Sequence, residues 1–500
     1  MDLSGWLLLT AAVYVVIFVC LTVYGRRRIA GRLVGFSLAG REMGPVTTAL
    51  AMCAVYTSAS TFMGMGGWAY AGGLAGVWPA MSQLWAMVIV LALFMTVMKR
   101  SGDRLGSMSL PDYLGDRYNS DLLRLVMAAL TLLNVYYLAG QFVGGATLLK
   151  TYFGLPYVTG VCVMAVATLV YVLIGGAYTE VMTNAFNGFV MFVVAVLLFF
   201  GGLWLVGGFE GLVSRLASVD PALLQEPVNP RSVVPTWGAW MGLFVIHWTL
   251  FISPHIANKF WAVRSGGSLK PFIIVATLVL GAYVLVSWVG LFARAMIPEP
   301  VTPDAAVPTF VNRFLPVWAA ALVGIGILAA IISTAAGLYI VIGTAVGNEF
   351  FRKTFVRRNW FGLAGLENAA VEARSILIAR ITMAAAALVA VAISWHPPQF
   401  LSSLMLIGLS TIGVGVVGPV GIGAWWRRAT PSGAIASLVA GAGTQLLLWP
   451  ILKFYTSPFA PGVIAAAVGA LTMIVVSLAT QPLSEEHLEK VLGSGRTVEA

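Results

Sequence analysis

Four hydroxyl side chains gather within five positions of one apolar stretch of the sequence. They are Thr57, Ser58, Ser60 and Thr61, and three glycines follow within positions 64–67. Hydroxyls in an apolar helix can bond back to the carbonyl four residues earlier, and glycines there can serve close packing. Alternatively, the cluster marks an interruption of the helix, which an apolar surrounding tolerates only where the chain lines a cavity. The density of polar groups favours the second interpretation.

A second pair of hydroxyls lies far along the chain, among small residues. Ser333 and Thr334 follow Ala330 by three and four positions, a spacing that places side chains on one helix face. Hydroxyl and carbonyl oxygens are the ligands that hard cations prefer. No aspartate or glutamate lies at the centre of any long apolar stretch. Partial charges alone would therefore hold a cation midway along these stretches, which suits Na⁺ better than a proton.

The composition indicates which elements must position these residues. Of the 500 residues, 59% are hydrophobic and only 10% are charged, whereas a soluble domain has about 45–50% apolar and about 25% charged residues. So few charges cannot cover a globule of this length in water. The composition predicts an all-α integral membrane protein and argues against a soluble enzyme, a nucleic-acid binder or a disordered scaffold.

An apolar stretch of about 20 residues can cross a bilayer as a helix, and the sequence contains thirteen such stretches. Their expected positions are 6–25, 46–71, 75–98, 123–148, 155–177, 181–206, 236–256, 271–297, 317–347, 374–395, 399–424, 432–452 and 461–480. The intervening loops are short. We therefore expect a single transmembrane domain over residues 1–484, followed by a cytoplasmic tail at 485–500.

The distribution of basic residues predicts the orientation. Cytoplasmic loops of membrane proteins carry an excess of Lys and Arg, and alternate loops of this chain carry most of its 29 basic residues. With an odd number of spans, this places the N-terminus outside and the C-terminus in the cytoplasm of a multi-pass protein in the cell's inner (plasma) membrane. The same bias accounts for the net charge of +10, so no nucleic-acid partner is expected.

The seventh apolar stretch contains a helix breaker. Ser253 and Pro254 lie near its end, after His247 and Trp248. Proline inside a helix removes a hydrogen bond and clashes with the carbonyl four residues earlier. If the chain has two similar halves, this break faces the one near Thr57. A pair of interrupted helices in corresponding positions is the sequence-level indication of a transporter's binding site.

Polar side chains on several stretches could line a solute cavity at these breaks. The candidates are Ser58, Ser60, Thr61, Gln83, Gln141, His247 and Trp248, with Ser402 and Ser403 as further members. Gln141 could instead make an interhelical hydrogen bond, and His247 could be a packed histidine bonded to a carbonyl. The start of a half-helix can hold a carboxylate without any arginine, so this set is compatible with an acidic solute.

Several segments, in order along the chain, resemble the pattern of the sodium/solute symporter family. They are 57–67, 109–118, Gly175–Gly176, 329–334 and 417–428. Within that family, 140–145 and Pro254–His255 resemble sodium/pantothenate and related monocarboxylate symporters. The resemblance implies a LeuT-type 5+5 inverted repeat, with repeats at about 46–206 and 236–424. One extra helix would precede the repeats and two would follow them.

The resemblance also implies a sodium site and a function. Carried over by position, the ligands would be the carbonyls of Ala54, Thr57 and Ala330 and the hydroxyls of Ser333 and Thr334. The chain would be a sodium-coupled symporter that imports a small organic solute by alternating access. A monocarboxylate such as pantothenate is the first expectation, and a proline-like amino acid or another small metabolite is the alternative. No cofactor other than Na⁺ is expected.

One position departs from the family pattern. Asn184 stands where the family usually has an aspartate at the start of the sixth span, and an amide brings no negative charge. The choice between Na⁺ and H⁺ coupling, and the stoichiometry, stay open on this account. Glu180 lies four residues earlier. It could compensate, but we expect it to be a solvated residue at the cytoplasmic end of a helix.

Two further function classes are weighed against a symporter. A transporter-like sensor would report its solute to a partner protein. A membrane enzyme is not expected, because no paired carboxylates, metal-ligand cluster or activated nucleophile lies at membrane depth. The expected partners are a small-molecule solute and membrane lipid, with no obligatory protein partner.

Overall fold

The computed structural model describes residues 3–27, 33–264, 269–297, 299–396, 401–455 and 457–493. Within these ranges the secondary structure is helical, apart from one isolated bridge between Met43 and Val263. Nine of the described helices are long and apolar enough to cross a membrane, or ten if a bent pair counts as one span. The expectation of an all-α membrane protein is confirmed.

The first half of the chain forms the helices that carry the first hydroxyl cluster. Their bounds are α1 (Leu3–Arg26), α2 (Leu33–Leu38), α3 (Pro45–Tyr56), η2 (Ser60–Gly64), α4 (Met65–Gly72), α5 (Trp78–Ile89), η4 (Val90–Met95), α6 (Thr96–Leu105), α7 (Leu110–Arg117), α8 (Asp121–Thr131), α9 (Asn134–Phe153), α10 (Tyr157–Val206) and α11 (Gly208–Val219).

The second half begins with another interrupted helix. Its elements are α12 (Trp237–Leu250), α13 (Pro254–Ala262), α14 (Lys270–Val284), α15 (Trp288–Met296), α16 (Ala306–Phe314), α17 (Val317–Thr344), η8 (Ala345–Val356), α18 (Asn368–Ser394), α19 (Leu401–Gly415), η10 (Val417–Ile422), α20 (Pro431–Leu446), α21 (Phe459–Ala479) and α22 (Glu485–Leu492). Each of the thirteen expected stretches contains helix in its described residues.

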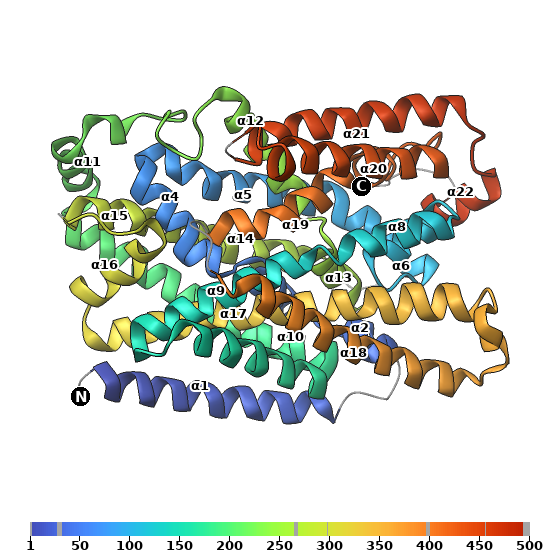
Figure 1. Cartoon of the computed structure of the whole chain (residues 1–500), viewed down its shortest axis with the longest axis horizontal. Helices are drawn as coiled ribbons and strands as arrows, with labels where there is room; N and C mark the ends of the chain where they lie inside the picture. The colour runs from blue at the N-terminus through green and yellow to red at the C-terminus, as the bar shows by residue number, and fades with distance from the viewer. Residues whose placement is uncertain are drawn as a thin grey trace.

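The burial of the helices identifies the centre of the molecule. In the most apolar 18-residue window of the continuous helix that contains α17, 89% of the residues are buried, against 17% in α1. Figure 1 shows α1 along one edge of the molecule and α21 along the opposite edge. Helix α17 packs against α3, α9 and α10. The second hydroxyl pair therefore lies on the central helix, and the first cluster follows one of its neighbours.

A glycine divides the 50-residue helix α10 into two parts. Gly176 has φ +52° and ψ −160°, a region that is essentially restricted to glycine. A Cβ atom at this position would lie 2.8 Å from Cδ2 of Phe36 on α2. The break falls at the boundary between the expected stretches 155–177 and 181–206. Each part of α10 has at least about 20 residues, the number that one membrane crossing needs.

Ion pairs join three elements at one end of the helices. Arg124 of α8 contacts carboxylates from α7, α8 and η8, and it is itself buried. The distances are 3.4 Å to Asp112, 2.8 Å to Asp116, 2.5 Å to Asp121 and 3.9 Å to Glu349. Burial, and then the neighbouring Asp112, raise the pKa of the Asp116 carboxyl above its usual range. This network gives segment 109–118 a structural role.

The polar tail is partly folded onto the rest of the protein. Helix α22 packs against α6, and its Leu488 and Val491 side chains are buried. His487 Nε2 lies 3.1 Å from the carbonyl oxygen of Arg117. Residues 494–500 of the expected tail lie outside the described residues. The start of the tail is therefore a docked helix.

Candidate functional site

The second membrane-spanning segment is interrupted next to the first hydroxyl cluster. Helix α3 ends at Tyr56, and Thr57 has an extended backbone with φ −84° and ψ 117°. The helical path resumes with η2 and α4. The expected break is therefore present. Because the last four carbonyls of a helix have no intrahelical partner, the end of α3 offers free oxygens inside the protein.

Hydroxyls and one amide side chain satisfy the backbone at this break. The amide N–H of Ser60 donates to Ser58 Oγ at 3.2 Å, and that of Ser58 donates to Thr61 Oγ1 at 3.4 Å. The N–H of Ala59 donates to Gln141 Oε1 of α9, also at 3.4 Å. Buried backbone donors need such partners. These residues thus stabilise the interruption.

The seventh segment is interrupted at the predicted proline. Helix α12 ends at Leu250, α13 begins at Pro254, and the two are bent by 44°. The Ser253 hydroxyl donates to the Leu250 carbonyl at 2.5 Å. The ring of Tyr56, at the end of α3, stacks on Phe251 with centroids 4.1 Å apart. The two breaks therefore face each other, as the sequence indicated.

The five oxygens expected to bind sodium come together where α17 passes the break in α3. Ser333 Oγ lies 2.8 Å from the Ala54 carbonyl and 3.0 Å from the Ala330 carbonyl. Thr334 Oγ1 lies 3.1 Å from the Thr57 carbonyl. All five residues are fully buried. This group, which we call the oxygen nest, contains only hydroxyls and carbonyls and has the donor set that suits Na⁺.

Two further oxygens lie beside the oxygen nest. The Val55 carbonyl accepts from Thr334 Oγ1 at 2.9 Å, and the Thr57 hydroxyl is buried without a hydrogen-bond partner. Sequence reasoning missed Val55. The signal that could have found it is the rule that all of the last four carbonyls of a terminating helix are free.

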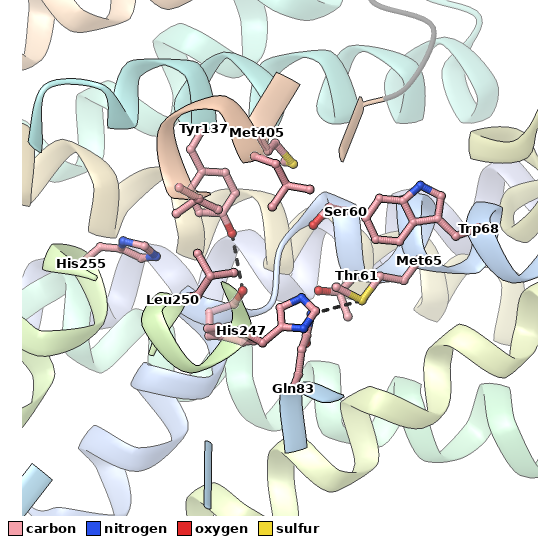
Figure 2. Close-up of a pocket in the computed structure, with 13 residues that line it drawn as sticks. Ser60, Thr61, Met65, Trp68, Gln83, Tyr137, His247, Leu250, His255 and Met405 are labelled. Carbon is pink, nitrogen blue, oxygen red and sulfur yellow. Dashed lines mark hydrogen bonds between the residues drawn. The ribbon is translucent and has the colours of Figure 1, made fainter. Parts of the chain in front are cut away.

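A small cavity lies between the two breaks (Figure 2). Four of the predicted solute residues line it: Ser60, Thr61, Gln83 and His247. The space inside it that water molecules could occupy is about 40 Å³, whereas one water needs about 10–15 Å³ by that measure. The cavity as it stands holds a few waters. A solute of metabolite size needs a wider opening.

His247 and Gln83, which line the cavity, each make a hydrogen-bond contact with a neighbouring side chain. His247 Nδ1 and Ser82 Oγ are 2.6 Å apart, so the partner of His247 is a side-chain hydroxyl and not a carbonyl. Gln83 Nε2 donates to the sulfur of Met65 at 3.4 Å. Both side chains line the same cavity as Thr61 and are labelled in Figure 2.

The other predicted solute residues do not line this cavity. Ser58 is buried beside it, with its Oγ 2.9 Å from Ser60 Oγ. Gln141 makes the interhelical hydrogen bond that was its alternative role. Trp248 packs edge-on against Phe94, with ring centroids 5.1 Å apart. The side chains of Ser402 and Ser403 lie outside the described residues.

Several lining residues were not proposed from the sequence. They are Tyr56, Met65, Trp68, Tyr137, Leu250, His255, Met405, Leu406 and Leu409. Tyr137 stands out because its hydroxyl donates to the Tyr56 carbonyl at 3.5 Å, at the end of α3. It precedes Gln141 by one helix turn, and that spacing could have indicated it. The apolar members carry no such sequence signal.

The expectation for Glu180 is wrong. Glu180 is fully buried and not solvated. Its carboxylate accepts from Asn184 Nδ2 at 2.6 Å and pairs with Lys259 of α13. Asn184 Nδ2 also contacts the Ser333 carbonyl at 3.3 Å. Glu180 thus places a buried carboxylate next to Asn184, because residues four apart share a helix face.

Within the described residues, no three His, Cys, Asp or Glu side chains form a group that could hold a metal ion. The oxygen nest is the candidate cation site because of its own hydroxyl and carbonyl oxygens.

Comparison with known proteins identifies the family. Residues 36–441 match the model of the Sodium:solute symporter family. The chain belongs to this family. It is a multi-pass membrane transporter and not an enzyme, and the expectation drawn from segments 57–67 and 329–334 is confirmed.

Named relatives cover most of the chain. A sodium/pantothenate symporter of Escherichia coli (strain K12) is 28% identical over 87% of this chain and 88% of its own length. One of Haemophilus influenzae is 26% identical over 85% and 86%. A high-affinity proline transporter of Bacillus subtilis is 25% identical over 91% and 94%.

Solved structures show the same fold. The structure of a Na⁺-coupled sialic acid symporter aligns with TM-score 0.77 at 16% identity, over 97% of this chain and 99% of that one. Mhp1, a nucleobase-cation-symport-1 family transporter, aligns with TM-score 0.56 at 14% identity, over 91% and 97%.

Proposed function

We propose that this protein is a sodium-coupled secondary active symporter that imports a small monocarboxylate, such as pantothenate, by alternating access. The observation that carries the proposal is the contact of the Ser333 and Thr334 hydroxyls with the free carbonyls of the α3 break. When Na⁺ binds, contacts between the ion and these oxygens would replace the hydrogen bonds between the hydroxyls and the carbonyls. The break also carries Ser60 and Thr61 of the cavity, so one segment serves both ligands.

The cavity supports a small solute with polar groups. Its polar lining consists of hydroxyls, one amide and two histidines, and it includes no lysine or arginine among the described residues. A carboxylate would then be held by hydroxyls and by the start of a half-helix. The relatives that are named sodium/pantothenate symporters support this class of solute. The named proline transporter keeps a proline-like amino acid as the alternative.

The architecture supports alternating access. We infer that the repeats extend over about 46–206 and 236–424, since each contains one of the facing breaks. The N-terminus would lie outside and the C-terminus in the cytoplasm. Rocking of one repeat against the other would open the small cavity first to one side and then to the other.

The driving force limits how far a solute could be concentrated. A tenfold sodium gradient supplies about 1.4 kcal/mol, and 100 mV adds about 2.3 kcal/mol per net charge moved. One Na⁺ carried with a monoanion moves no net charge, so a tenfold gradient concentrates the solute only about tenfold. Stronger accumulation of a monoanion requires a second cation.

The sodium site is tested by removing both hydroxyls of α17. Ser333→Ala combined with Thr334→Ala should raise the sodium concentration that gives half-maximal uptake at least tenfold, because about 1.4 kcal/mol of ion binding corresponds to a factor of ten. The readout is uptake of radiolabelled pantothenate into proteoliposomes at varied sodium. Unchanged sodium dependence would refute the site, and uptake that follows pH while ignoring sodium would replace it with proton coupling.

The matched control is Ser437→Ala. Ser437 is also buried and donates across a helix interface, to the Gly469 carbonyl at 2.7 Å, but between α20 and α21. Its replacement should leave the sodium dependence unchanged.

The solute and the mode of action need a second measurement. A thermal-shift screen of small monocarboxylates and proline, with and without sodium, should show the largest stabilisation for a monocarboxylate in sodium. Net accumulation of that solute against its gradient distinguishes a symporter from a transporter-like sensor, which binds without accumulating.

A further inference from the structure

A lysine and a glutamate form a buried ion pair beside the oxygen nest. Lys259 Nζ contacts Glu180 Oε2, and the two side chains are 5% and 0% exposed. Lys259 belongs to α13, the second half of the interrupted seventh segment, and Glu180 belongs to α10. A buried ion pair is costly to desolvate and is weak evidence for stability. Its position therefore calls for a functional account.

A short chain of contacts joins this pair to the oxygen nest. Asn184 Nδ2 donates both to Glu180 Oε1 at 2.6 Å and to the Ser333 carbonyl at 3.3 Å. The Ser333 hydroxyl in turn contacts the Ala54 carbonyl. A Cβ atom on Gly337, one turn beyond Ser333, would lie only 3.6 Å from Glu180 Oε1. The carboxylate thus lies against the helix that supplies the nest's hydroxyls.

The surroundings of Glu180 could hold a cation other than the lysine ammonium. Asn184 Oδ1 is buried and has no hydrogen-bond partner, and the Ser333 carbonyl lies 3.3 Å from the other amide atom, Nδ2. Carboxylate, amide and carbonyl oxygens are ligands for hard cations. A second cavity, lined by Lys259, His255, Asn258 and Ser37, adjoins this place. That cavity, about 10 Å³ in volume, has room for about one water molecule beside the Lys259 side chain.

We propose that Lys259 is a tethered cation. Its ammonium group occupies the position beside the Glu180 carboxylate that a second Na⁺ would otherwise take, so each transport cycle couples a single Na⁺. This inference rests on the proposed sodium symport. It follows from charge: a buried carboxylate must be paired with a positive group, and a lysine that is part of the chain supplies that charge permanently.

The tether has a consequence for energetics. Because Lys259 returns with the carrier in every cycle, its charge contributes nothing to net transport. Import of a monoanion with one Na⁺ is then electroneutral. A tenfold sodium gradient should concentrate the monoanion about tenfold, and the membrane potential should not change this ratio.

The number of bound sodium ions tests the inference. Purified carrier is titrated with ²²Na⁺ to saturation. The native chain should bind one Na⁺ per molecule. Lys259→Met should bind two, because Glu180 then lacks its partner. Lys259→Arg, which keeps the charge, and the combined Glu180→Gln, Lys259→Met variant, which removes the carboxylate as well, should each bind one.

The outcomes separate this inference from the proposed function. Two ions bound to the native chain would overturn the tether while leaving sodium symport intact. A single ion bound to a stable Lys259→Met variant would also overturn it. No ion bound to the native chain would contradict the sodium site itself. If Lys259→Met does not fold, Lys259→Gln, which also removes the charge and keeps Glu180, takes its place and should bind two.

Discussion

At the scale of single residues, the hydroxyl groups near the α3 break divide into two sets. Ser58 and Thr61 accept hydrogen bonds from backbone amides of the break. Ser333 and Thr334 instead donate to the carbonyls that the break leaves free. The first set maintains the interruption, and the second belongs to the oxygen nest that we propose binds Na⁺. Ser60 differs from both, because its hydroxyl contacts Ser58 Oγ and lines the cavity.

Ser60 therefore offers a specific prediction. Ser60→Ala should raise the KM for the solute up to about tenfold, since a lost hydrogen bond costs about 0.5–1.5 kcal/mol and more when the partner is charged. Sodium binding without solute should stay unchanged, because Ser60 contributes no oxygen to the nest. Solute uptake and ²²Na⁺ binding measure the two effects.

The control for Ser60→Ala is the same substitution at a serine outside the site. Ser375→Ala in α18 removes only a bond to the Val371 carbonyl, within the same helix. It should change neither quantity. Equal KM values for Ser60→Ala and the native chain would exclude Ser60 from solute contact.

At the scale of elements, both functional breaks and the α10 break depend on local chemistry. Pro254 starts α13, and Ser58 and Thr61 stabilise the interruption after α3. Gly176 adopts a backbone conformation that other residues avoid. These are properties of short segments. They are the reason why the positions of the first two breaks could be predicted from the sequence.

Gly176 gives a prediction about stability. Gly176→Ala should lower the free energy of unfolding by about 1–3 kcal/mol, the typical cost of such a backbone conformation for a residue other than glycine. The close approach of Phe36, 2.8 Å from a Cβ atom, adds to this cost. The melting temperature of the purified protein is the measurement.

Gly281 provides the matched comparison. It lies inside α14, and a Cβ atom there would meet nothing within 4 Å. Gly281→Ala should leave stability unchanged or raise it by up to about 1 kcal/mol, because alanine favours helix more than glycine does. A similar loss of stability in both variants would contradict the role given to the Gly176 break.

At the scale of the whole molecule, orientation in the membrane is a proposal that rests on the basic loops. It can be tested with single cysteines on a background in which Cys20, Cys53 and Cys162 are replaced by alanine. Arg231→Cys, at an exposed position between α11 and α12, should react with an impermeant maleimide in intact cells. Glu486→Cys, exposed on α22, should react only after the membrane is permeabilised. The reverse pattern would invert the proposed topology.

The sequence by itself determined the class of protein and the positions of the two breaks, and its resemblance to the sodium/solute symporter family implied the five oxygens of the nest. Low charge over 500 residues requires lipid-exposed helices, and a proline or a hydroxyl cluster acts within a few residues of its position. The spacing of three and four residues likewise places Ser333 and Thr334 each on a common helix face with Ala330. Each of these signals is local, so each could be interpreted without knowing which helices meet.

Only the tertiary structure decided which partners these residues have. Glu180 was expected in solvent but is buried, because α13 brings Lys259 to it. Gln141 bonds the α3 break and Trp248 packs on Phe94, so neither lines the cavity. The physical reason is the same in each case. A polar side chain on a membrane helix takes its role from the neighbouring helix it meets, and that neighbour lies tens or hundreds of residues away in the chain.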